Sequence, residues 1–189
     1  MIVRARRESA GFVSGRAAPQ FREERSMTSA TTAWRIRAWA DPGLEKRFLR
    51  EGFVAVRHDE FGCPVTSFGS DVELRARLEQ HNPGRSRKAI GLFVSYWRNF
   101  SRSMRTGHTI VVSLTGRRAA IGTIAGPYEY DPAEPDPHLR HRRAVEWHSI
   151  TDRTHLDEDL RRAADAPGTL FRLRADDAGV RLRRLGHVA

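Results

Sequence analysis

The chain lacks several features, and each absence excludes a class of protein. There is one cysteine, Cys63, among 189 residues, which excludes an intramolecular disulfide and a zinc site built from cysteines. No apolar run reaches the length that a membrane-spanning helix needs. The first residues also lack the apolar centre of a secretory signal. We therefore expect a cytoplasmic protein that has no membrane partner.

Acidic residues are missing from a long central part of the chain. No aspartate or glutamate occurs between Glu79 and Glu129, although the chain has 23 acidic residues against 33 lysines and arginines, a net charge of +10. Almost all of the basic residues are arginines, which codon usage in a GC-rich genome explains as well as the affinity of arginine for phosphate does. Codon usage does not explain missing acids. The acid-free stretch therefore favours a folded surface that binds a polyanion.

The length of the chain fits one domain with tails. Residues 1–33 are rich in Arg, Ala, Ser and Thr and have no sustained period, so we predict a flexible basic leader. The hydrophobic pattern begins abruptly at Trp34, which makes Met27 a candidate for the true start of the protein. A single domain is predicted over residues 34–189.

Short strands and short helices alternate along this domain. Strands are predicted over residues 34–38, 53–56, 109–114, 119–125, 142–150, 169–174 and 180–185, the last two as a hairpin. Helices are predicted over residues 44–51, 71–82, 87–104 and 156–164. The pattern predicts an α+β fold, a small β-barrel of about six or seven strands flanked by short helices.

Three local patterns carry more specific expectations. In the first strand, Trp34 and Ile36 alternate with arginines, which predicts one apolar and one polar face. In the second helix, Val72 is expected to face inward together with two leucines. The pair Gly126-Pro127 is expected to end the strand that begins at residue 119.

A series of short motifs runs through the central part of the chain. The motifs are Trp97-Arg98-Asn99-Phe100, Met104-Arg105-Thr106-Gly107, Thr109-Ile110-Val111-Val112, Ala120-Ile121-Gly122-Thr123-Ile124 and Gly126-Pro127-Tyr128-Glu129-Tyr130, supported by Ala33-Trp34-Arg35-Ile36-Arg37 and Val145-Glu146-Trp147. In this order they resemble the PUA-like superfamily, particularly its EVE and YTH branch. More closely, the chain is similar to the amino-terminal module of Mrr-type restriction endonucleases. The resemblance covers roughly residues 34–174.

This resemblance implies a barrel with a pocket that takes up a flipped, often modified, nucleobase between aromatic side chains. Extruding a base costs a few kcal/mol, which aromatic faces and edge hydrogen bonds offset. By position in the family, Ser95, Tyr96 and Trp97 line this pocket, although Trp97 is equally well explained as a core residue. Tyr128 and Tyr130 follow a Gly-Pro pair and are predicted to stack at the barrel mouth, with hairpin packing as the alternative.

Basic residues near these aromatic side chains are predicted to contact phosphates. They are Arg85, Arg87, Lys88, Arg98, Arg102, Arg105, Arg172 and Arg174. A solvated helix face or a charged strand edge is the alternative. Two departures from the family matter: His108 stands where relatives usually have aspartate, and no nuclease motif is found. We therefore expect neither catalytic residues nor a cofactor.

These patterns together predict a non-catalytic nucleic-acid-binding module that recognises a flipped modified base in a restriction or defence context. DNA is favoured over RNA, and a separate nuclease subunit is a further expected partner. An RNA-binding PUA-like module is the first alternative, because the 2′-hydroxyl contact has no sequence signature. A second is a small metal-dependent hydrolase, and a third is a scaffold that binds an acidic protein. The hydrolase would use four histidines whose spacing matches no compact ligand pattern: His138, His141, His148 and His155.

Overall fold

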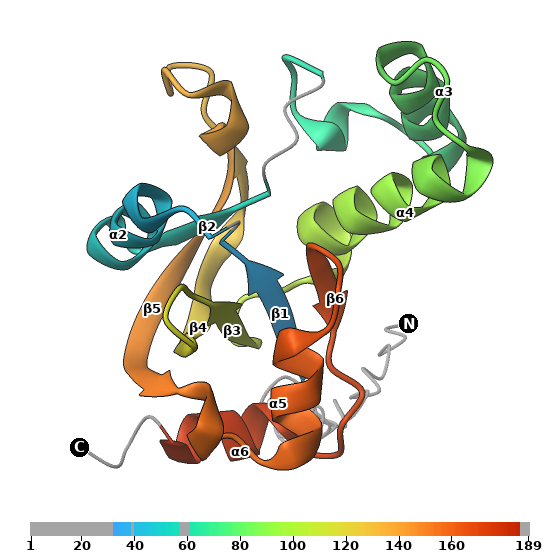
Figure 1. The fold of residues 1–189 in the computed structure, drawn as a ribbon. Helices are drawn as coiled ribbons and strands as arrows, with labels where there is room; N and C mark the ends of the chain where they lie inside the picture. The colour runs from blue at the N-terminus through green and yellow to red at the C-terminus, as the bar shows by residue number, and fades with distance from the viewer. Residues whose placement is uncertain (1–31, 39, 57–60, 186–189) are drawn as a thin grey trace, which may run out of the picture.

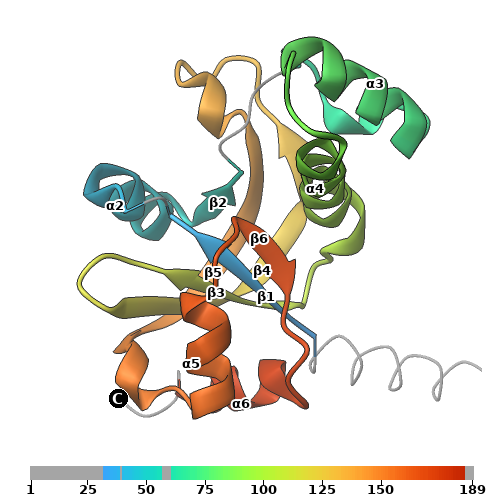
Figure 2. The same cartoon turned by 45° about the vertical axis from the view of Figure 1, so that its right-hand side comes forward.

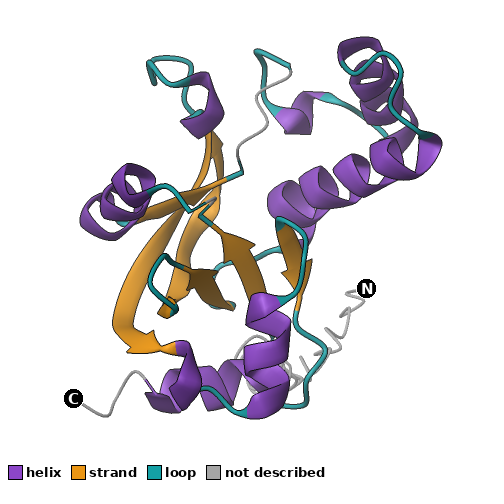
Figure 3. Ribbon diagram, viewed as in Figure 1, coloured by secondary structure: helices purple, strands orange, loops and turns teal. Residues whose placement is uncertain are grey.

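The computed structural model describes residues 32–38, 40–56 and 61–185. These residues form an α+β fold in which a six-stranded sheet curls into a half-barrel, with five helices around it (Figures 1 and 3). The strand order is β2-β5-β4-β3-β1-β6, with β1 parallel to β3 and all other neighbours antiparallel. The sheet is therefore open, and its two edges are β2 and β6.

Six of the seven predicted strands occur among the described residues, and they form an open half-barrel, not a closed barrel. The strands are β1 (Ala33–Arg37), β2 (Phe53–Ala55), β3 (Thr109–Ser113), β4 (Arg118–Tyr130), β5 (His141–Asp152) and β6 (Leu170–Arg172). The helices are α2 (Pro42–Glu51), α3 (Asp71–His81), α4 (Arg87–Arg98), α5 (Glu158–Asp165) and α6 (Ala178–Leu185). A π-helical turn, η2 (Asn99–Ser103), continues α4, and short 3₁₀ turns are η1 (Val65–Ser67), η3 (Pro137–Leu139) and η4 (Arg153–His155).

Hydrophobic cores lie on both faces of the sheet. Successive side chains of a strand point to opposite faces, so Ile110 of β3 packs in the larger core with Trp97 of α4, whereas Val111 packs in the smaller one. The smaller core lies under α5 and α6, which occupy the same side of the sheet (Figure 2). Figure 1 shows α3 and α4 projecting beyond the sheet on another side. The two cores explain why most strands have few exposed side chains.

The first strand differs from its predicted pattern, because its polar face is buried as well. Arg35 has 0% exposure and lies under the carboxyl end of α5. Its guanidinium donates hydrogen bonds to the carbonyl oxygens of Ala164 and Ala166, each at 2.9 Å, and to that of Gly168. The last carbonyls of a helix have no partner within the helix. Arg35 therefore satisfies these groups and fixes α5 to the sheet.

The predicted final hairpin is wrong in its second half. Residues 170–172 form β6, which pairs with β1, but residues 178–185 form α6. Ala178 and Leu182 are buried and lie four residues apart, the helical spacing, and Leu185 follows three residues later. The same short segment also fits an alternating strand pattern. Periodicity alone does not separate the two in so short a run.

Two of the local expectations are also wrong. Pro127 does not end β4, which continues to Tyr130 through a break in the β4–β5 register between Ile124 and Tyr128. Proline is tolerated at such a bulge because no ladder hydrogen bond is needed there. Val72 does not face inward, since its side chain is 76% exposed. Val72 lies in the first turn of α3, two residues after the N-cap Ser70, where its side chain faces solvent.

Several end signals are confirmed. Gly52 ends α2 in the left-handed conformation with φ of 67°, and the Ser70 hydroxyl accepts a hydrogen bond from the Glu73 amide at the start of α3. The predicted leader lies outside the described residues except for Thr32 and Ala33, and Met27 also lies outside them. Ala33 already belongs to β1. Within the described part of the chain, none of the helices has the length and apolar character required to cross a membrane.

Candidate nucleic-acid interface

An open hollow of about 520 Å³ lies where η2 and the turn after it meet the bulge of β4. We name it the Arg143 hollow after the arginine of β5 that borders it. The residues that line it are Thr66, Ser101, Arg102, Met104, Arg105, Thr106, Pro127, Tyr128 and Arg143. This set contains three arginines and several hydroxyl groups, and no carboxylate among the described residues. Such a lining suits an anionic or strongly polar ligand.

Arg143 is a buried cation held by backbone carbonyls. Its side chain is only 3% exposed, and its nitrogens donate to the carbonyl oxygens of Phe100 at 2.6 Å, Gly126 at 3.1 Å and Ser101 at 3.1 Å. Burial lowers the pKa of Arg143 to about 10, so it stays protonated at neutral pH. It forms no ion pair with a carboxylate of the described chain. Its positive charge therefore remains available to the hollow.

The π-helical turn places the carbonyls that Arg143 binds. α4 does not stop at Arg98 but widens into η2, where the Met104 amide donates to the Asn99 carbonyl at 2.8 Å and the Ser101 hydroxyl to the Trp97 carbonyl at 2.7 Å. π-turns are rare and frequently occur at functional sites. This one joins the helix end to the β4 bulge through Arg143, so both walls of the hollow share one cation.

Tyr128 connects the hollow to a buried histidine. Its hydroxyl oxygen accepts a hydrogen bond from the Val65 amide at 3.0 Å and lies 2.6 Å from Nδ1 of His141. The hydroxyl and the imidazole share one hydrogen bond, and the imidazole tautomer decides which of them donates. The bond fixes the tyrosine ring beside the hollow.

An aromatic cluster surrounds His141, which is fully buried. Its ring centroid lies 4.6 Å from that of Trp97, 4.9 Å from that of Tyr130 and 6.0 Å from that of Tyr128. Phe61 completes the cluster with an edge-to-face contact to Trp97 at 5.4 Å. Three of the five predicted pocket residues thus come together. The imidazole of His141 occupies the centre of the group.

The five predicted pocket residues do not line one pocket. Trp97 is 1% exposed, and Tyr96 is buried with its hydroxyl accepting from the Thr169 amide at 3.4 Å. Neither lines the Arg143 hollow, the hollow that Ser95 borders or the one that Arg37 borders, so stacking on a base at these places would require the surrounding side chains to move. Ser95 borders a different hollow, between α3 and α4. Tyr128 is the member that borders the Arg143 hollow.

The predicted phosphate-binding residues divide into three groups. All eight are exposed. Arg102 and Arg105 border the Arg143 hollow, and Arg98 lies one turn before it on α4. Arg85, Arg87 and Lys88 lie at the other end of α4, about 18 Å away at 1.5 Å per helical residue. Arg172 is the last residue of β6, and Arg174 lies two residues after it.

The region is less free of acid in space than along the chain. Asp71, the first residue of α3, lies 3.4 Å from Nη1 of Arg98 and 3.8 Å from Nη1 of Arg102. Arg102 also donates to the Phe68 carbonyl at 2.6 Å. Arg105 has no such ion pair within the described chain. The acid is contributed by a residue that precedes the acid-free stretch.

His108 shows that three arginines share one positive region. Burial, followed by the charges of Arg172, Arg105 and Arg143, lowers the pKa of His108 to about 4. Its Nδ1 accepts hydrogen bonds from Nε1 of Trp34 at 2.9 Å and from the Arg105 amide at 3.2 Å. A neutral acceptor therefore stands where the family resemblance expects an aspartate. The arrangement leaves the positive charges around it without compensation.

A third hollow, of about 610 Å³, lies at the opposite end of β3 and is bordered by Arg37, Thr115 and Arg153. Its cations are engaged by Asp165, which forms an ion pair with Arg153 at 2.8 Å and accepts a hydrogen bond from Arg37 through its backbone oxygen. This hollow is larger than the Arg143 hollow, but it is the weaker candidate for an anionic ligand.

Three of the four histidines proposed as metal ligands contact different groups. His148 is hydrogen-bonded to Thr123 at 2.7 Å and His155 to Thr151 at 3.2 Å, whereas His141 lies in the aromatic cluster. Across residues 32–38, 40–56 and 61–185, no three His, Cys, Asp or Glu side chains are placed to share a metal ion.

The sequence interpretation missed Arg143 as a site residue. A signal was present, because Arg143 shares a strand face with His141 and Val145, and all three are buried. Alternation therefore placed this arginine toward the core. His141 was considered only as a metal ligand, and its contact with Tyr128 depends on the β4–β5 register.

Comparison with known proteins adds a family without a known activity. No curated protein matches the chain. Residues 39–174 match the model of a family described as a domain of unknown function, DUF8426. This segment contains the whole Arg143 hollow and the aromatic cluster, and it omits β1 and α6. Because the match spans well over half of the sequence, the chain belongs to the DUF8426 family.

Proposed function

We propose that the protein is a nucleic-acid-binding module that holds phosphates along α4 and η2 and recognises one nucleotide at the Arg143 hollow. The observation that carries this proposal is the lining of the hollow. Arg102, Arg105 and Arg143 meet there beside the Tyr128 hydroxyl, with no carboxylate among the described lining residues. Arginine forks bind phosphate in two-point contacts, and tyrosine supplies a ring face for a base.

The start of α4 supports an extended anionic ligand. The first turn of α3 carries Asp71 and Glu73, which suit the positive end of a helix dipole. The first turn of α4 instead carries Arg87 and Lys88 and no acid. Cations at this end repel the dipole, and a bound anion relieves that repulsion. The length of α4, about 18 Å, corresponds to about five nucleotides at 3.4 Å each.

We further propose that the half-barrel is a PUA-like domain of the EVE and YTH branch and that a flipped, modified base enters the Arg143 hollow. The β4 bulge supports this, since it brings Pro127 and Tyr128 to the rim while Arg143 remains beneath them. The preference for DNA, the restriction or defence context and the separate nuclease subunit rest on the family resemblance. The expected module is not itself an enzyme.

The polyanion part is tested by the salt dependence of binding. The affinity of the full chain for a labelled oligonucleotide is measured between about 50 and 300 mM salt. Each phosphate contact contributes about 0.9 to the slope of log K against log salt, because binding releases counterions. Arg105→Gln should reduce the slope of log K against log salt by about 0.9. Arg162→Gln on α5, which is exposed and does not line the hollow, is the matched control. Equal slopes for both variants and the wild type would sink the phosphate assignment.

The base part is tested with duplexes that differ in one modified base. We expect the wild type to bind one of the methylated or hydroxymethylated duplexes more tightly than the unmodified one. Tyr128→Phe should reduce this difference in affinity without changing the slope of log K against log salt. Structured RNA in the same series separates the RNA alternative. Equal affinity for every duplex, modified or plain, would contradict base recognition while leaving phosphate binding intact.

A further inference from the structure

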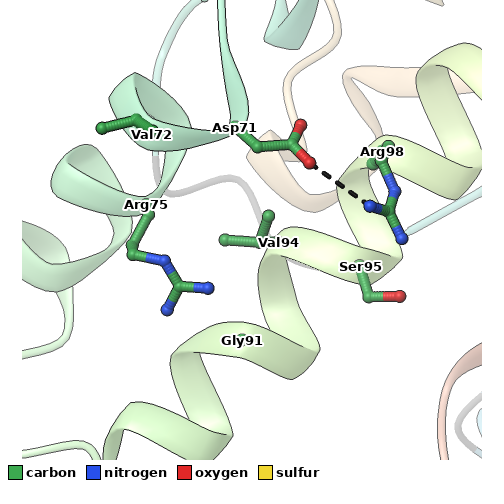
Figure 4. A pocket seen from close by; sticks show the side chains of 7 residues that line it. All are labelled: Asp71, Val72, Arg75, Gly91, Val94, Ser95 and Arg98. Carbon is green, nitrogen blue, oxygen red and sulfur yellow. Dashed lines mark hydrogen bonds and ion pairs between the residues drawn. The ribbon is translucent and has the colours of Figure 1, made fainter.

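A second groove, of about 300 Å³, lies between the first turns of α3 and the middle of α4 (Figure 4). We refer to it as the α3–α4 groove. It shares no lining residue with the Arg143 hollow, although Asp71 of the groove also pairs with Arg102 of that hollow at 3.8 Å. Figure 4 shows Arg75 and Val72 on the α3 side, Gly91 and Val94 on the α4 side, and the Asp71–Arg98 ion pair at one end.

The groove has an apolar wall that the fold leaves uncovered. Val72 is 76% exposed, although Leu74 and Leu78 of the same helix are buried. Val94 of α4 lies at the base of the groove, where it is 5% exposed. Exposed single valines are common, but this one borders a hollow with a second apolar residue. The pair offers a site for a bulky apolar side chain.

Gly91 keeps the groove open, and packing within the chain does not require it. A methyl group added at this position would meet only Nη2 of Arg75, at 3.7 Å, an ordinary contact with a flexible side chain. Glycine inside a helix costs about 1 kcal/mol relative to alanine. The glycine therefore loses stability without a steric reason in the free protein. What it provides is a close approach of another molecule to α4.

Arg75 supplies the polar contact. Its guanidinium lies over Gly91, and it forms no ion pair with a carboxylate among the described residues. The cation at the other end, Arg98, is already paired with Asp71 at 3.4 Å. The groove thus has one unpaired cation beside an apolar floor, and one end that carries a carboxylate.

We propose that the α3–α4 groove is a docking site for a segment of a partner protein in which a bulky apolar side chain adjoins a carboxylate. The apolar side chain packs on Val72 and Val94, with its backbone against Gly91, and the carboxylate pairs with Arg75. Charged hydrogen bonds of this two-point kind are strong and directional. A nucleic acid fits less well, because the lining has no aromatic face on which a base could stack, whereas the two valines suit an apolar side chain.

The probe is a set of short capped peptides in which Leu, Phe or Met precedes Asp or Glu, together with the same peptides carrying Asn or Gln. Binding to the full chain is followed by amide NMR shifts without nucleic acid present. We expect shifts at Val72, Arg75, Gly91 and Val94, and a Kd at least about tenfold lower for the best acidic peptide than for its amide counterpart.

Two variants and a control separate docking from folding. Arg75→Gln should remove the difference between acidic and amide peptides, whereas Arg77→Gln, on the same helix outside the groove, should keep it. Gly91→Ala should weaken all peptides while raising the melting temperature, so that unfolding does not explain the loss. Absence of shifts at these four amides with every peptide would overturn the proposal. Shifts there with duplex DNA alone would assign the groove to the nucleic-acid surface instead.

Discussion

Two buried arginines, Arg35 in β1 and Arg143 in β5, have the same chemistry in different surroundings. Each donates to three backbone carbonyls, at least two of them near the end of a helical segment, and burial lowers the pKa of each to about 10. Neither has an ion pair with a carboxylate of the described chain. Arg35, however, is sealed under α5, whereas Arg143 borders an open hollow.

The difference separates a structural role from a binding role. A buried cation bonded to orphan carbonyls stabilises a helix end wherever it lies. Only the one that borders solvent also contributes its charge to a ligand. We therefore expect substitution of Arg35 to affect folding alone, and substitution of Arg143 to affect folding and binding.

The largest effect is expected for Arg35→Met. The change removes the charged donor from three carbonyls, although Ala164 keeps the Ser113 hydroxyl at 2.8 Å and Ala166 keeps Arg37 at 3.3 Å. A hydrogen bond to a charged group contributes about 1.5–3 kcal/mol. We predict a loss of about 3 kcal/mol or more in the free energy of unfolding, measured by urea denaturation. At a temperature where this variant is folded, its affinity for an oligonucleotide should equal that of the wild type. A large loss of affinity in the folded variant would contradict a purely structural role for Arg35.

Arg143→Met should cost less stability and more affinity. Water reaches the edge of the hollow, so the carbonyls of Phe100, Ser101 and Gly126 find replacement partners more easily, and we expect a loss of about 1–3 kcal/mol. The affinity for an oligonucleotide should fall about tenfold or more, in line with the loss of one charge-assisted contact. Unchanged affinity in a folded Arg143→Met protein would assign this arginine to structure alone.

Tyr128→Phe tests the connection between the hollow and the aromatic cluster. Loss of the hydroxyl leaves the Val65 amide and Nδ1 of His141 without that partner, which should cost about 1–3 kcal/mol in urea denaturation. Tyr130→Phe is the matched control, since its hydroxyl forms no hydrogen bond with the described residues and its ring contacts the same histidine. Equal losses for both variants would place the stabilisation in the rings and not in the hydrogen bond.

A pH-dependent effect is expected at His108. Its pKa is lowered to about 4 in the folded state, so the unfolded state, with a pKa near 6.5, binds more protons between these values. Stability should therefore fall as pH decreases from about 6.5 toward 4. His108→Gln, which retains an acceptor for Trp34, should show a weaker dependence of the urea midpoint on pH over this range. An unchanged dependence would show that His108 does not titrate with folding.

Local patterns predicted most elements of the fold but not its buried charges. The left-handed Gly52 and the Ser70 cap are local signals, and both ends lie where the sequence places them. Arg35 alternates with apolar residues as a surface residue would, and only the packing of α5 on β1 buries it. The final hairpin failed because residues 178–185 fit two periods.

The candidate site was predictable in part for the same reason. Arg102, Arg105 and Tyr128 were named from charge and motif, and all three border the Arg143 hollow. The ion pairs of Asp71 with Arg98 and Arg102 join segments far apart in the chain, so a stretch without acid in sequence acquires one in space. The position of His141 depends on the bulge in β4, which no local pattern indicates.

The central claim is that the Arg143 hollow receives a nucleotide, and amide NMR of the full chain titrated with a single-stranded pentanucleotide tests it most directly. We predict that the largest shifts occur at Arg102, Arg105, Thr106 and Tyr128, on the walls of this hollow. Largest shifts at Ser113, Thr115 and Arg153, around the larger hollow at the other end of β3, would contradict it.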